Sequence, residues 1–528
     1  MFACIGVCCG LAKAETFEAM YPNVVLIYTD DQGYGDVSAL NPEAKFKTPN
    51  IDRLVHEGMT FTDGHCSDTV CTPSRYGLLT GRYSWRTRLK SGVFGAEGEC
   101  LIEDGRMTLA SLFRDHGYRT AMVGKWHLGM VFDGKVGDRD WSRPFTDGPI
   151  EKGFDYFFGI PASMNYGVLT YLEADRLLKP ADLWTAKKPG KVVHDRASYR
   201  IMPPYEKEPL QKGQPLEVAG DFVDEKVLEV FTTKAIEWIE AGTRVAGRKK
   251  PFFVYLPLTS PHKPVCPQQR FEGKSQAGAY GDFMVETDHW VGEILKALKR
   301  LGVDRETMIV FTSDNGPENT YAARKEMYQH SSAGIYRGGK RDLYEGGHRV
   351  PFIIRWPEMV KAGTRWNGPV CQTDLLATFG EMMGIGLPPN AGEDSESFWN
   401  VLQGKPEKQG ARAPLVHHSA SGHFAIRDGD WKLNMGRGSQ GNKAAKNGES
   451  PVELYNLKAD PSETAEVGDQ HVQIVQRLQS RLTDLIRHGR STVGPKQTND
   501  REWWSQLTWM PAPEGTPVPK KKRRGKRK

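Results

Sequence analysis

Long apolar runs are missing from nearly all of this 528-residue sequence. Beyond the first dozen residues, no stretch approaches the roughly 20 consecutive apolar residues that a membrane-spanning helix needs. No internal repeat is visible, which argues against a repeat architecture. Apolar residues make up 38% of the chain and charged residues 26%, as in ordinary globular proteins. The length predicts one large α/β domain or two domains.

Cysteine is scarce and widely spaced, with eight residues in the whole chain. No two of them form a C-x-x-C pair, so a zinc site is not expected. Three lie near the N-terminus, and five lie in the body: Cys66, Cys71, Cys100, Cys266 and Cys371. If Cys71 has a separate role, the other four either form disulfides in an exported protein or remain buried thiols.

A strong charge on the body of the chain is missing as well, although the formal net charge is +6. The excess comes from Lys520–Lys528, which holds eight Lys or Arg and no acid. The rest of the chain has 63 basic and 65 acidic residues and is close to neutral. We predict that residues 511–528 are a disordered basic tail. It could contact anionic polysaccharide or membrane, but no specific nucleic-acid partner is expected.

The N-terminus carries the most apolar segment. Phe2–Ala12 is mostly apolar, and Ala12-Lys13-Ala14 supplies small residues of the kind that flank a cleavage site. No Lys or Arg precedes the apolar run, which is atypical of a signal. We predict that residues 1–14 are a signal peptide and that the protein is exported to the periplasm or the extracellular space.

Two apolar, β-branched runs end in oxygen-bearing side chains. Val24–Tyr28 and Met308–Thr312 are predicted to be strands buried on both faces, as in a parallel sheet. Open α/β sheets bind their ligands at the carboxyl ends of such strands. The donors that follow these strands are Asp30, Asp31, Asp314 and Asn315. These oxygen ligands suit Ca²⁺, with Mg²⁺ as the second choice. The alternative is that the Asp-Asp sequence forms a solvent-exposed turn that binds no metal.

Basic side chains also follow predicted strands. Lys125 and His127 come after Thr120–Val123, and on an extended segment they would face the same side. His262 follows the strand Phe252–Leu256 and stands between two prolines. Taken alone, Lys125 and His127 would usually be explained by surface exposure, and the alternative for His262 is a structural histidine.

Two more cations complete the set. Lys340 lies in a glycine-rich segment, where the backbone can approach closely. Arg75 follows Cys71 by four residues, and the two leucines after it indicate a helix beginning just after the cysteine. A helix N-terminus favours anionic groups. Together with a divalent metal, this much positive charge suits a tetrahedral oxyanion ester, either sulfate or phosphate.

Residues 71 to 82 carry the most specific pattern, Cys-Thr-Pro-Ser-Arg-Tyr-Gly-Leu-Leu-Thr-Gly-Arg. The pattern C-x-P-S-R-x-x-L-L-T-G-R resembles the signature of the type I sulfatases of the alkaline phosphatase superfamily. Gly124–Gly129 (GKWHLG) and Gln372–Thr378 (QTDLLAT) resemble further blocks of that family. The resemblance covers roughly residues 20–490. It implies that a formylglycine-generating or anaerobic sulfatase-maturing enzyme oxidises Cys71 to formylglycine.

The resemblance also implies a mechanism and a role for each residue. One hydroxyl of the hydrated formylglycine attacks sulfur, and the alcohol leaves. The other hydroxyl then loses its proton, sulfate departs and the aldehyde returns. The resemblance implies that the metal is held by Asp30, Asp31, Asp314, Asn315 and residue 71, and that Arg75 orients the formylglycine. It implies that Lys125, Lys340 and His262 bind the sulfate. His127 would be the base for sulfate release, and His262 would be the acid that protonates the leaving alcohol.

The predicted fold class is α/β, a large mixed, mainly parallel sheet sandwiched by helices. A smaller antiparallel sheet with a packed helix follows toward the C-terminus. We assign residues 20–410 to the catalytic domain and 411–510 to a C-terminal subdomain. Residues 130–220 read as loops inserted over an active site. The aromatic segment Gly153–Gly159 within them is predicted to be core.

Two other functions fit parts of this sequence. A phosphomonoesterase or phosphodiesterase of the same superfamily would use a Ser or Thr nucleophile and generally two zinc ions held by histidines, a set not apparent here. A non-catalytic protein that binds sulfated glycans would result if Cys71 were never matured. A carbohydrate sulfate is favoured over a small aryl sulfate as substrate. The polar residues expected near the motifs are Asn165, Tyr166, Arg341 and His348.

Overall fold

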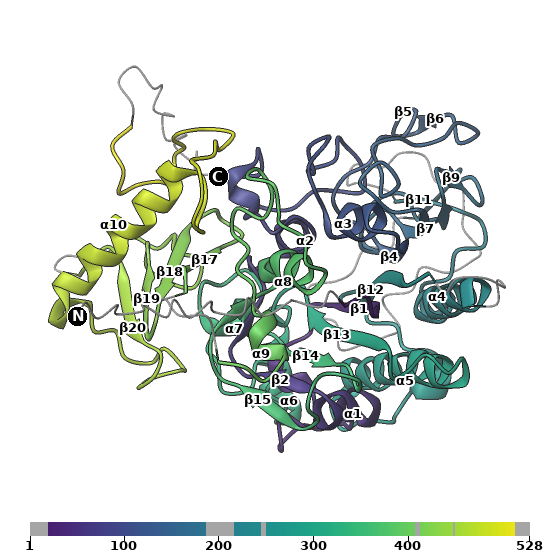
Figure 1. Cartoon of the computed structure of the whole chain (residues 1–528), viewed down its shortest axis with the longest axis horizontal. Helices are drawn as coiled ribbons and strands as arrows, with labels where there is room; N and C mark the ends of the chain where they lie inside the picture. Colours follow the sequence, from purple (N-terminus) through teal and green to yellow (C-terminus); the bar gives the residue numbers. More distant parts are fainter. Residues whose placement is uncertain (1–19, 186–215, 244–249, 407–411, 447–448, 513–528) are drawn as a thin grey trace, which may run out of the picture.

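The computed structural model describes residues 20–185, 216–243, 250–406, 412–446 and 449–512 (Figure 1). The predicted signal peptide, residues 513–528 of the predicted basic tail and the boundary near residue 411 lie outside the described residues. Among those that are described, no helix is both long and apolar enough to cross a bilayer.

A ten-stranded sheet forms the centre of the molecule (Figure 1). Its five central strands, β13, β1, β12, β4 and β7, run parallel, and antiparallel strands flank them on both sides. The predicted mixed, mainly parallel sheet is therefore confirmed. In order across the sheet the strands are β15 (Thr364–Trp366), β2 (Met59–Phe61), β14 (Phe352–Arg355), β13 (Thr307–Ser313), β1 (Asn23–Asp30), β12 (Phe252–Pro261), β4 (Arg119–Lys125), β7 (Tyr156–Ile160), β8 (Leu172–Glu173) and β9 (Arg176–Leu177).

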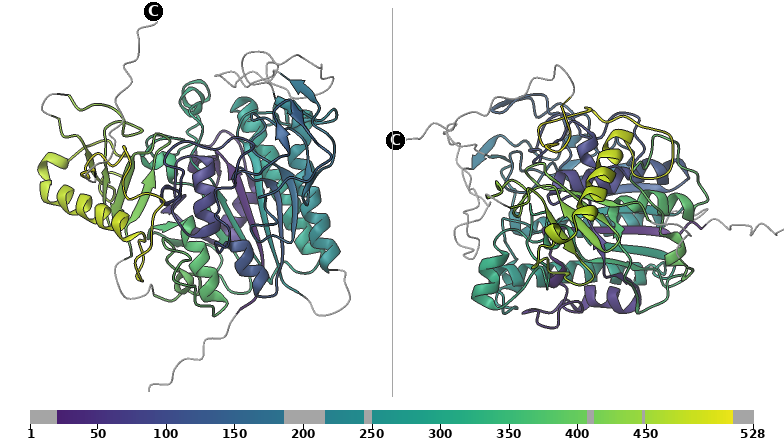
Figure 2. Two further views of the ribbon diagram at one scale, coloured as in Figure 1. Left: turned by 90° about the horizontal axis from the view of Figure 1, so that it is seen from above. Right: turned by 90° about the vertical axis from the view of Figure 1, so that its left-hand side faces the viewer.

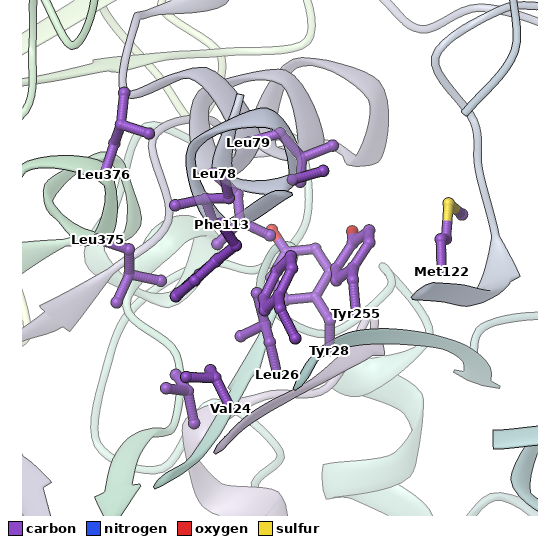
Figure 3. Close-up of a cluster of buried hydrophobic side chains, with 14 of the residues drawn as sticks. Val24, Leu26, Tyr28, Leu78, Leu79, Phe113, Met122, Tyr255, Leu375 and Leu376 are labelled. Carbon is purple, nitrogen blue, oxygen red and sulfur yellow. The ribbon is translucent and has the colours of Figure 1, made fainter. Parts of the chain in front are cut away.

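Helices cover both faces of this sheet. The first face packs against α1 (Pro49–Glu57), α4 (Val227–Thr243) and α5 (Gly278–Arg300). The second packs against α2 (Cys71–Thr80), α3 (Leu109–Asp115) and α8 (Leu375–Met382). Alternate β1 side chains enter opposite cores, which explains the unbroken apolar run of this strand. Figure 3 shows the second core, with Val24, Leu26 and Tyr28 of β1 below Leu78, Leu79, Phe113, Leu375 and Leu376.

A four-stranded antiparallel sheet lies to one side of the large sheet (Figure 2). Its strands are β17 (Leu415–His418), β18 (Phe424–Asp428), β19 (Trp431–Asn434) and β20 (Glu453–Asn456). The amphipathic helix α10 (Val472–His488) packs on it through Leu478, Leu482 and Ile486. The predicted C-terminal sheet with a packed helix is confirmed.

The remaining elements are short. The strands are β3 (Gly64–His65), β5 (Gly134–Lys135), β6 (Asp138–Arg139), β10 (Leu183–Thr185), β11 (Leu216–Val218) and β16 (Val370–Cys371). The helices are α6 (Tyr321–Tyr328), α7 (Glu345–His348) and α9 (Trp399–Leu402). The five body cysteines are free and buried, so the disulfide alternative is not realised.

Local pattern missed two features of the main sheet. The aromatic segment Gly153–Gly159 is core, as expected, but it also supplies β7, a strand of the parallel sheet. Helix α5 begins at Gly278, a start that the local pattern does not favour. Its first turns contain two glycines, which are poor helix formers. Burial of Tyr280 and Phe283 outweighs that weakness.

Candidate active site

Cys71 is the first residue of α2, and every residue of this helix is buried. Its Sγ lies 3.5 Å from Asp30 Oδ1 and 3.4 Å from Lys340 Nζ. The helix therefore points its N-terminus at the carboxyl end of β1, as the sequence predicted. Burial, and then the Asp314 carboxylate, raises the pKa of the Cys71 thiol well above its ordinary range. The unmodified side chain is a neutral thiol and a poor nucleophile.

The oxygen donors meet because β1 and β13 are parallel neighbours, with Thr29 paired to Ser313. The Asp31 amide donates to Asp314 Oδ1 at 3.1 Å, and Asn315 Nδ2 donates to Asp31 Oδ1 at 2.7 Å. Two buried oxygens, Asp31 Oδ2 and Asn315 Oδ1, have no hydrogen-bond partner within the described part of the chain. Potential ligand atoms of Asp30, Asp31, Cys71 and His262 lie within 4.8 Å of one another. Buried oxygens without partners are the expected signature of a cation site.

Three buried cations pair with the three carboxylates. Lys125 Nζ lies 2.5 Å from Asp30 Oδ2, and Lys340 Nζ lies 2.6 Å from Asp31 Oδ1. Arg75 bonds Asp314 Oδ2 at 2.7 Å. The formal charges of these six side chains cancel. A divalent metal added to this site would balance a doubly charged oxyanion such as sulfate.

These charges also act on the carboxylates themselves. Burial alone would raise the pKa of Asp30, but Lys125 and Arg75 hold it below its ordinary value. Burial and the neighbouring Asp30 carboxylate raise the pKa of Asp314. Two carboxylates this close share one electrostatic environment, and a cation between them would favour the ionised form of both.

His127 reaches this site by a different route from the predicted one. The extended strand stops at Lys125, and His127 has a left-handed backbone with φ of 60°. The expectation that both residues face one side of an extended segment is therefore wrong. His127 Nε2 lies 3.0 Å from the Phe94 carbonyl, and Nδ1 has no partner among the residues described. Burial, followed by Lys125 and Arg75, lowers the pKa of His127 well below 6.5, so the ring is neutral.

His262 directly follows β12, at the end of the strand beside β1. Its Nδ1 lies 2.7 Å from the Lys263 carbonyl oxygen, and its Nε2 lies 3.7 Å from Asp31 Oδ2. Burial, and then the charge of Lys340, lowers the pKa of His262 to about 3. The imidazole is neutral here and holds one nitrogen toward the Asp31 carboxylate.

Lys340 is placed by close contact between two glycine-containing loops. A Cβ atom on Gly316 would lie 1.8 Å from the Gly346 carbonyl oxygen, so only glycine fits. The Lys340 amide donates to the Pro317 carbonyl at 2.8 Å. These contacts dock the Lys340 loop on the segment that carries Asp314 and Asn315, as the glycine pattern predicted.

A second group of charges lies beside the sulfate-binding candidates, and the sequence reasoning missed its central residue. Glu318 makes two hydrogen bonds with the Arg341 guanidinium and lies 3.4 Å from Lys263 Nζ. Burial alone would raise the pKa of Glu318, but Lys340 and Arg341 hold it well below its usual range. We call Glu318, Arg341 and Lys263 the rim cluster.

The segment after β7 borders the same site. The Tyr166 ring packs against His127 with 5.1 Å between ring centroids, as its predicted place near the motifs requires. The Ser163 hydroxyl is buried without a partner among the described residues, just beyond Pro161, whose carbonyl accepts the His127 amide. Ser163 is a candidate that the sequence analysis missed. The Asn165 side-chain oxygen is also unpartnered in the described structure.

His348 does not belong to this site, which corrects its predicted place near the motifs. It is fully buried, and its ring stacks on His417 with 3.6 Å between centroids. Its Nδ1 lies 3.0 Å from His65 Nδ1. We call His65, His348 and His417 the histidine cluster. It lies where β17 of the small sheet meets α7.

Comparison with known proteins identifies the family. Residues 22–385 match the family model described as Sulfatase, and residues 334–488 match N-sulphoglucosamine sulphohydrolase, C-terminal. The chain is 33% identical over 494 residues to the N-acetylgalactosamine-6-O-sulfatase of Bacteroides thetaiotaomicron, covering 88% of this chain and 93% of the relative. It is 31% identical over 471 residues to human arylsulfatase A, covering 86% and 84%.

A solved structure gives the same answer. It comes from work on glycosaminoglycan metabolism by Bacteroides thetaiotaomicron, and it matches with a TM-score of 0.74 and 31% identity. The match covers 88% of this chain and 99% of that one. The chain therefore belongs to the sulfatase family and is a sulfuric ester hydrolase.

Proposed function

We propose that this enzyme hydrolyses a carbohydrate sulfate and releases inorganic sulfate, with residue 71 acting as formylglycine beside one divalent metal. The observation that carries the proposal is the placement of Cys71. It begins a buried helix, inside the maturation pattern, with Asp30 and Lys340 both within 3.5 Å of its sulfur. A buried neutral thiol is a poor nucleophile there, whereas a hydrated aldehyde at the same position supplies two hydroxyl groups.

The donor set supports Ca²⁺, with Mg²⁺ as the second choice. Asp30, Asp31, Asp314 and Asn315 offer oxygen ligands, which hard cations prefer. The bound cation would give a partner to the two unpartnered buried oxygens, on Asp31 and Asn315. When bound, the metal would act as a Lewis acid on the reacting oxygens.

Lys125 and Lys340 are suited to hold the sulfate. In this structure they neutralise Asp30 and Asp31. With Asp30 and Asp31 serving as metal ligands, both ammonium groups would be available to the oxygens of the substrate. Fixed cations of this kind stabilise charge that develops in the transition state. Arg75 would hold Asp314 and the formylglycine in position.

The two histidines would move the protons. His127 has a neutral ring and a free Nδ1, as a base for the release step requires. His262 would protonate the departing alcohol, although its pKa of about 3 keeps it neutral without substrate. The cause lies in burial and in Lys340, so the negative charge of a bound sulfate ester would raise the pKa of His262. We expect His262 to take up its proton when substrate binds.

A sugar substrate is favoured by the polar rim cluster and by the relatives. One relative is named for the 6-O-sulfate of N-acetylgalactosamine, which makes this sugar the first substrate to test. The proposed setting is an exported protein that meets its maturation enzyme during synthesis. The phosphatase alternative finds no support, because no second set of metal-binding histidines lies beside Cys71 among the described residues.

The test uses protein co-expressed with a maturation enzyme. Sulfated mono- and oligosaccharides that differ in sulfate position are assayed by sulfate release, beside 4-nitrophenyl sulfate and 4-nitrophenyl phosphate. We expect a sugar sulfate to be cleaved fastest, chelation to stop the reaction, and Ca²⁺ to restore it. Faster cleavage of the phosphate ester would overturn the proposal. Binding without turnover by protein whose residue 71 is formylglycine would do the same.

A further inference from the structure

A basic groove lies on the C-terminal subdomain, between α10 and the segment that follows it (α10 is labelled in Figure 1). Its volume is about 720 Å³. The lining residues are Arg477, Ser480, Arg481, Asp484, Leu485, Arg487, His488, Arg490, Ser491, Thr492 and Lys496. Five of these side chains are cations at neutral pH, and one is a carboxylate.

The cations on α10 are not neutralised by the protein. Arg477, Arg481 and Arg487 are exposed, and no ion pair joins any of them to an acid among the described residues. Arg477 and Arg481 are four residues apart on one face, and like charges at that spacing destabilise a helix. The opposite face of α10 is fixed in the core, so the helix cannot turn these cations away. An anionic ligand would relieve the repulsion.

Arg490 lines the groove and is only 6% exposed. Its guanidinium donates to the Thr492 and Pro389 carbonyls, to the Thr492 hydroxyl and, at 3.5 Å, to the Pro495 carbonyl. All of these acceptors are uncharged, and no carboxylate pairs with Arg490 in the described structure. Buried arginines normally have a counter-charge. The missing counter-charge is a second indication, independent of the α10 cations, that the groove receives an anion.

We propose that this groove binds sulfate groups of a polymeric sulfated polysaccharide and anchors the polymer away from the catalytic site. The inference rests on the proposed function. Arg86, six residues beyond the end of α2, donates to the Leu485 carbonyl at 3.3 Å. The groove thus lies past the far end of α2, whose ten residues span roughly 15 Å from Cys71.

The lining favours a sulfated sugar over nucleic acid. It includes the exposed hydroxyl group of Ser480, which can bond sugar and sulfate oxygens. It includes no Phe, Tyr or Trp, the side chains on which single-stranded bases stack.

The test compares two matched double variants of the full-length matured enzyme. Arg477→Glu with Arg481→Glu reverses two groove charges at i and i+4. Lys296→Glu with Arg300→Glu makes the same change on α5, where these side chains are 65% and 62% exposed. The probe is chondroitin sulfate, with unsulfated chondroitin as the reference. We expect the groove variant to bind the sulfated polymer about tenfold more weakly than wild type, and the α5 variant to bind nearly as wild type does.

Turnover of a sulfated monosaccharide should be unchanged in both variants, whereas desulfation of the polymer should slow in the groove variant through a higher KM. Equal weakening in both variants would overturn the proposal. Binding of single-stranded DNA or anionic vesicles as tightly as chondroitin sulfate would also overturn it. Failure of the proposed function is distinguishable, because it would abolish monosaccharide turnover in every protein and leave the binding comparison readable.

Discussion

The active site and the histidine cluster are both buried groups of potential metal ligands, and both hold unpartnered polar atoms, but the geometry of those atoms differs. In each, ligand atoms of three or more residues lie within 4.8 Å of one another. In the active site, Asp31 and Asn315 leave buried oxygens unpartnered among the described residues, close to three carboxylates. In the histidine cluster, both ring nitrogens of His417 are likewise unpartnered among the described residues, but the rings of His348 and His417 are nearly parallel, at 11°, and stack at 3.6 Å.

Ring geometry decides what the histidine cluster can do. The lone pair of an imidazole nitrogen lies in the plane of its ring, so two parallel stacked rings cannot direct lone pairs at one ion. Lys432 Nζ lies 3.0 Å from His348 Nε2 and also pairs with Glu345 and Glu463. The cluster therefore joins the small sheet to the large domain. The comparison teaches that unsatisfied atoms with convergent directions, more than residue types, mark a reactive site.

The largest contrast concerns the nucleophile. Cys71→Ala should lower kcat/KM for a sulfate ester by about 10⁴-fold or more, because no other group on the described site replaces the attacking hydroxyl. Cys100→Ala, at another buried thiol, should retain activity. Steady-state sulfate release checks both, with thermal unfolding to confirm folding. Substantial activity in Cys71→Ala would show that the group around Cys71 is not the reactive site.

Two buried lysines give the next contrast. Lys340→Ala should lower kcat/KM by about 10²- to 10³-fold, since it removes a cation facing the sulfate. Lys432→Met should instead destabilise the fold by about 3–5 kcal/mol, because Glu345 and Glu463 would lose their partner. Kinetics and urea unfolding of both variants separate the two effects. A catalytic defect in folded Lys432→Met would show that the histidine cluster and the active site are coupled.

Charge on the rim cluster should affect substrate choice. Glu318 neutralises part of the charge of Arg341 and Lys263. Glu318→Gln would remove the negative charge that neutralises these two cations, so both would act on the leaving group of the substrate. We expect the ratio of kcat/KM for a disulfated sugar to that for its monosulfated form to rise about tenfold. An unchanged ratio would mean that the rim cluster does not contact the sugar.

The smallest effect is a pH dependence in the histidine cluster. Burial, and then His65 and Lys432, lowers the pKa of His417 well below its ordinary value of about 6.5. The unfolded chain takes up a proton below pH ~6.5 while the folded protein does not. The stabilising contribution of this histidine is therefore full above that pH and is lost as the pH falls.

His417→Phe keeps an aromatic ring to stack on His348 but removes this proton uptake. Relative to wild type, its free energy of unfolding should improve by up to about 1.4 kcal/mol for each pH unit below pH ~6.5. Urea unfolding at pH 7.5 and pH 5.0 measures the difference. The same stability difference at both pH values would show that His417 does not remain neutral in the fold.

Local pattern predicted those parts of the site that lie at strand ends. The apolar runs before Asp30 and Asp314 indicate buried parallel strands, and parallel strands bring their carboxyl ends to one edge. The C-x-P-S-R pattern placed Cys71 at a helix start, where the structure has it. The roles assigned to these residues remain predictions for the experiments above.

Long-range packing set what the sequence could not show. Glu318 matters because Arg341, 23 residues later, folds back onto it. His348 was expected near the active-site motifs, but its partners His65 and His417 come from distant segments. The left-handed backbone of His127 likewise has no local signature. Contacts between distant segments are not encoded in spacing or periodicity.

Mass spectrometry of the Cys71 peptide from an active preparation tests the central claim most directly. The account predicts that residue 71 carries an aldehyde oxygen in place of the thiol sulfur, and that sulfatase activity rises in proportion to this fraction across preparations. An active preparation in which Cys71 is entirely an unmodified cysteine would contradict it.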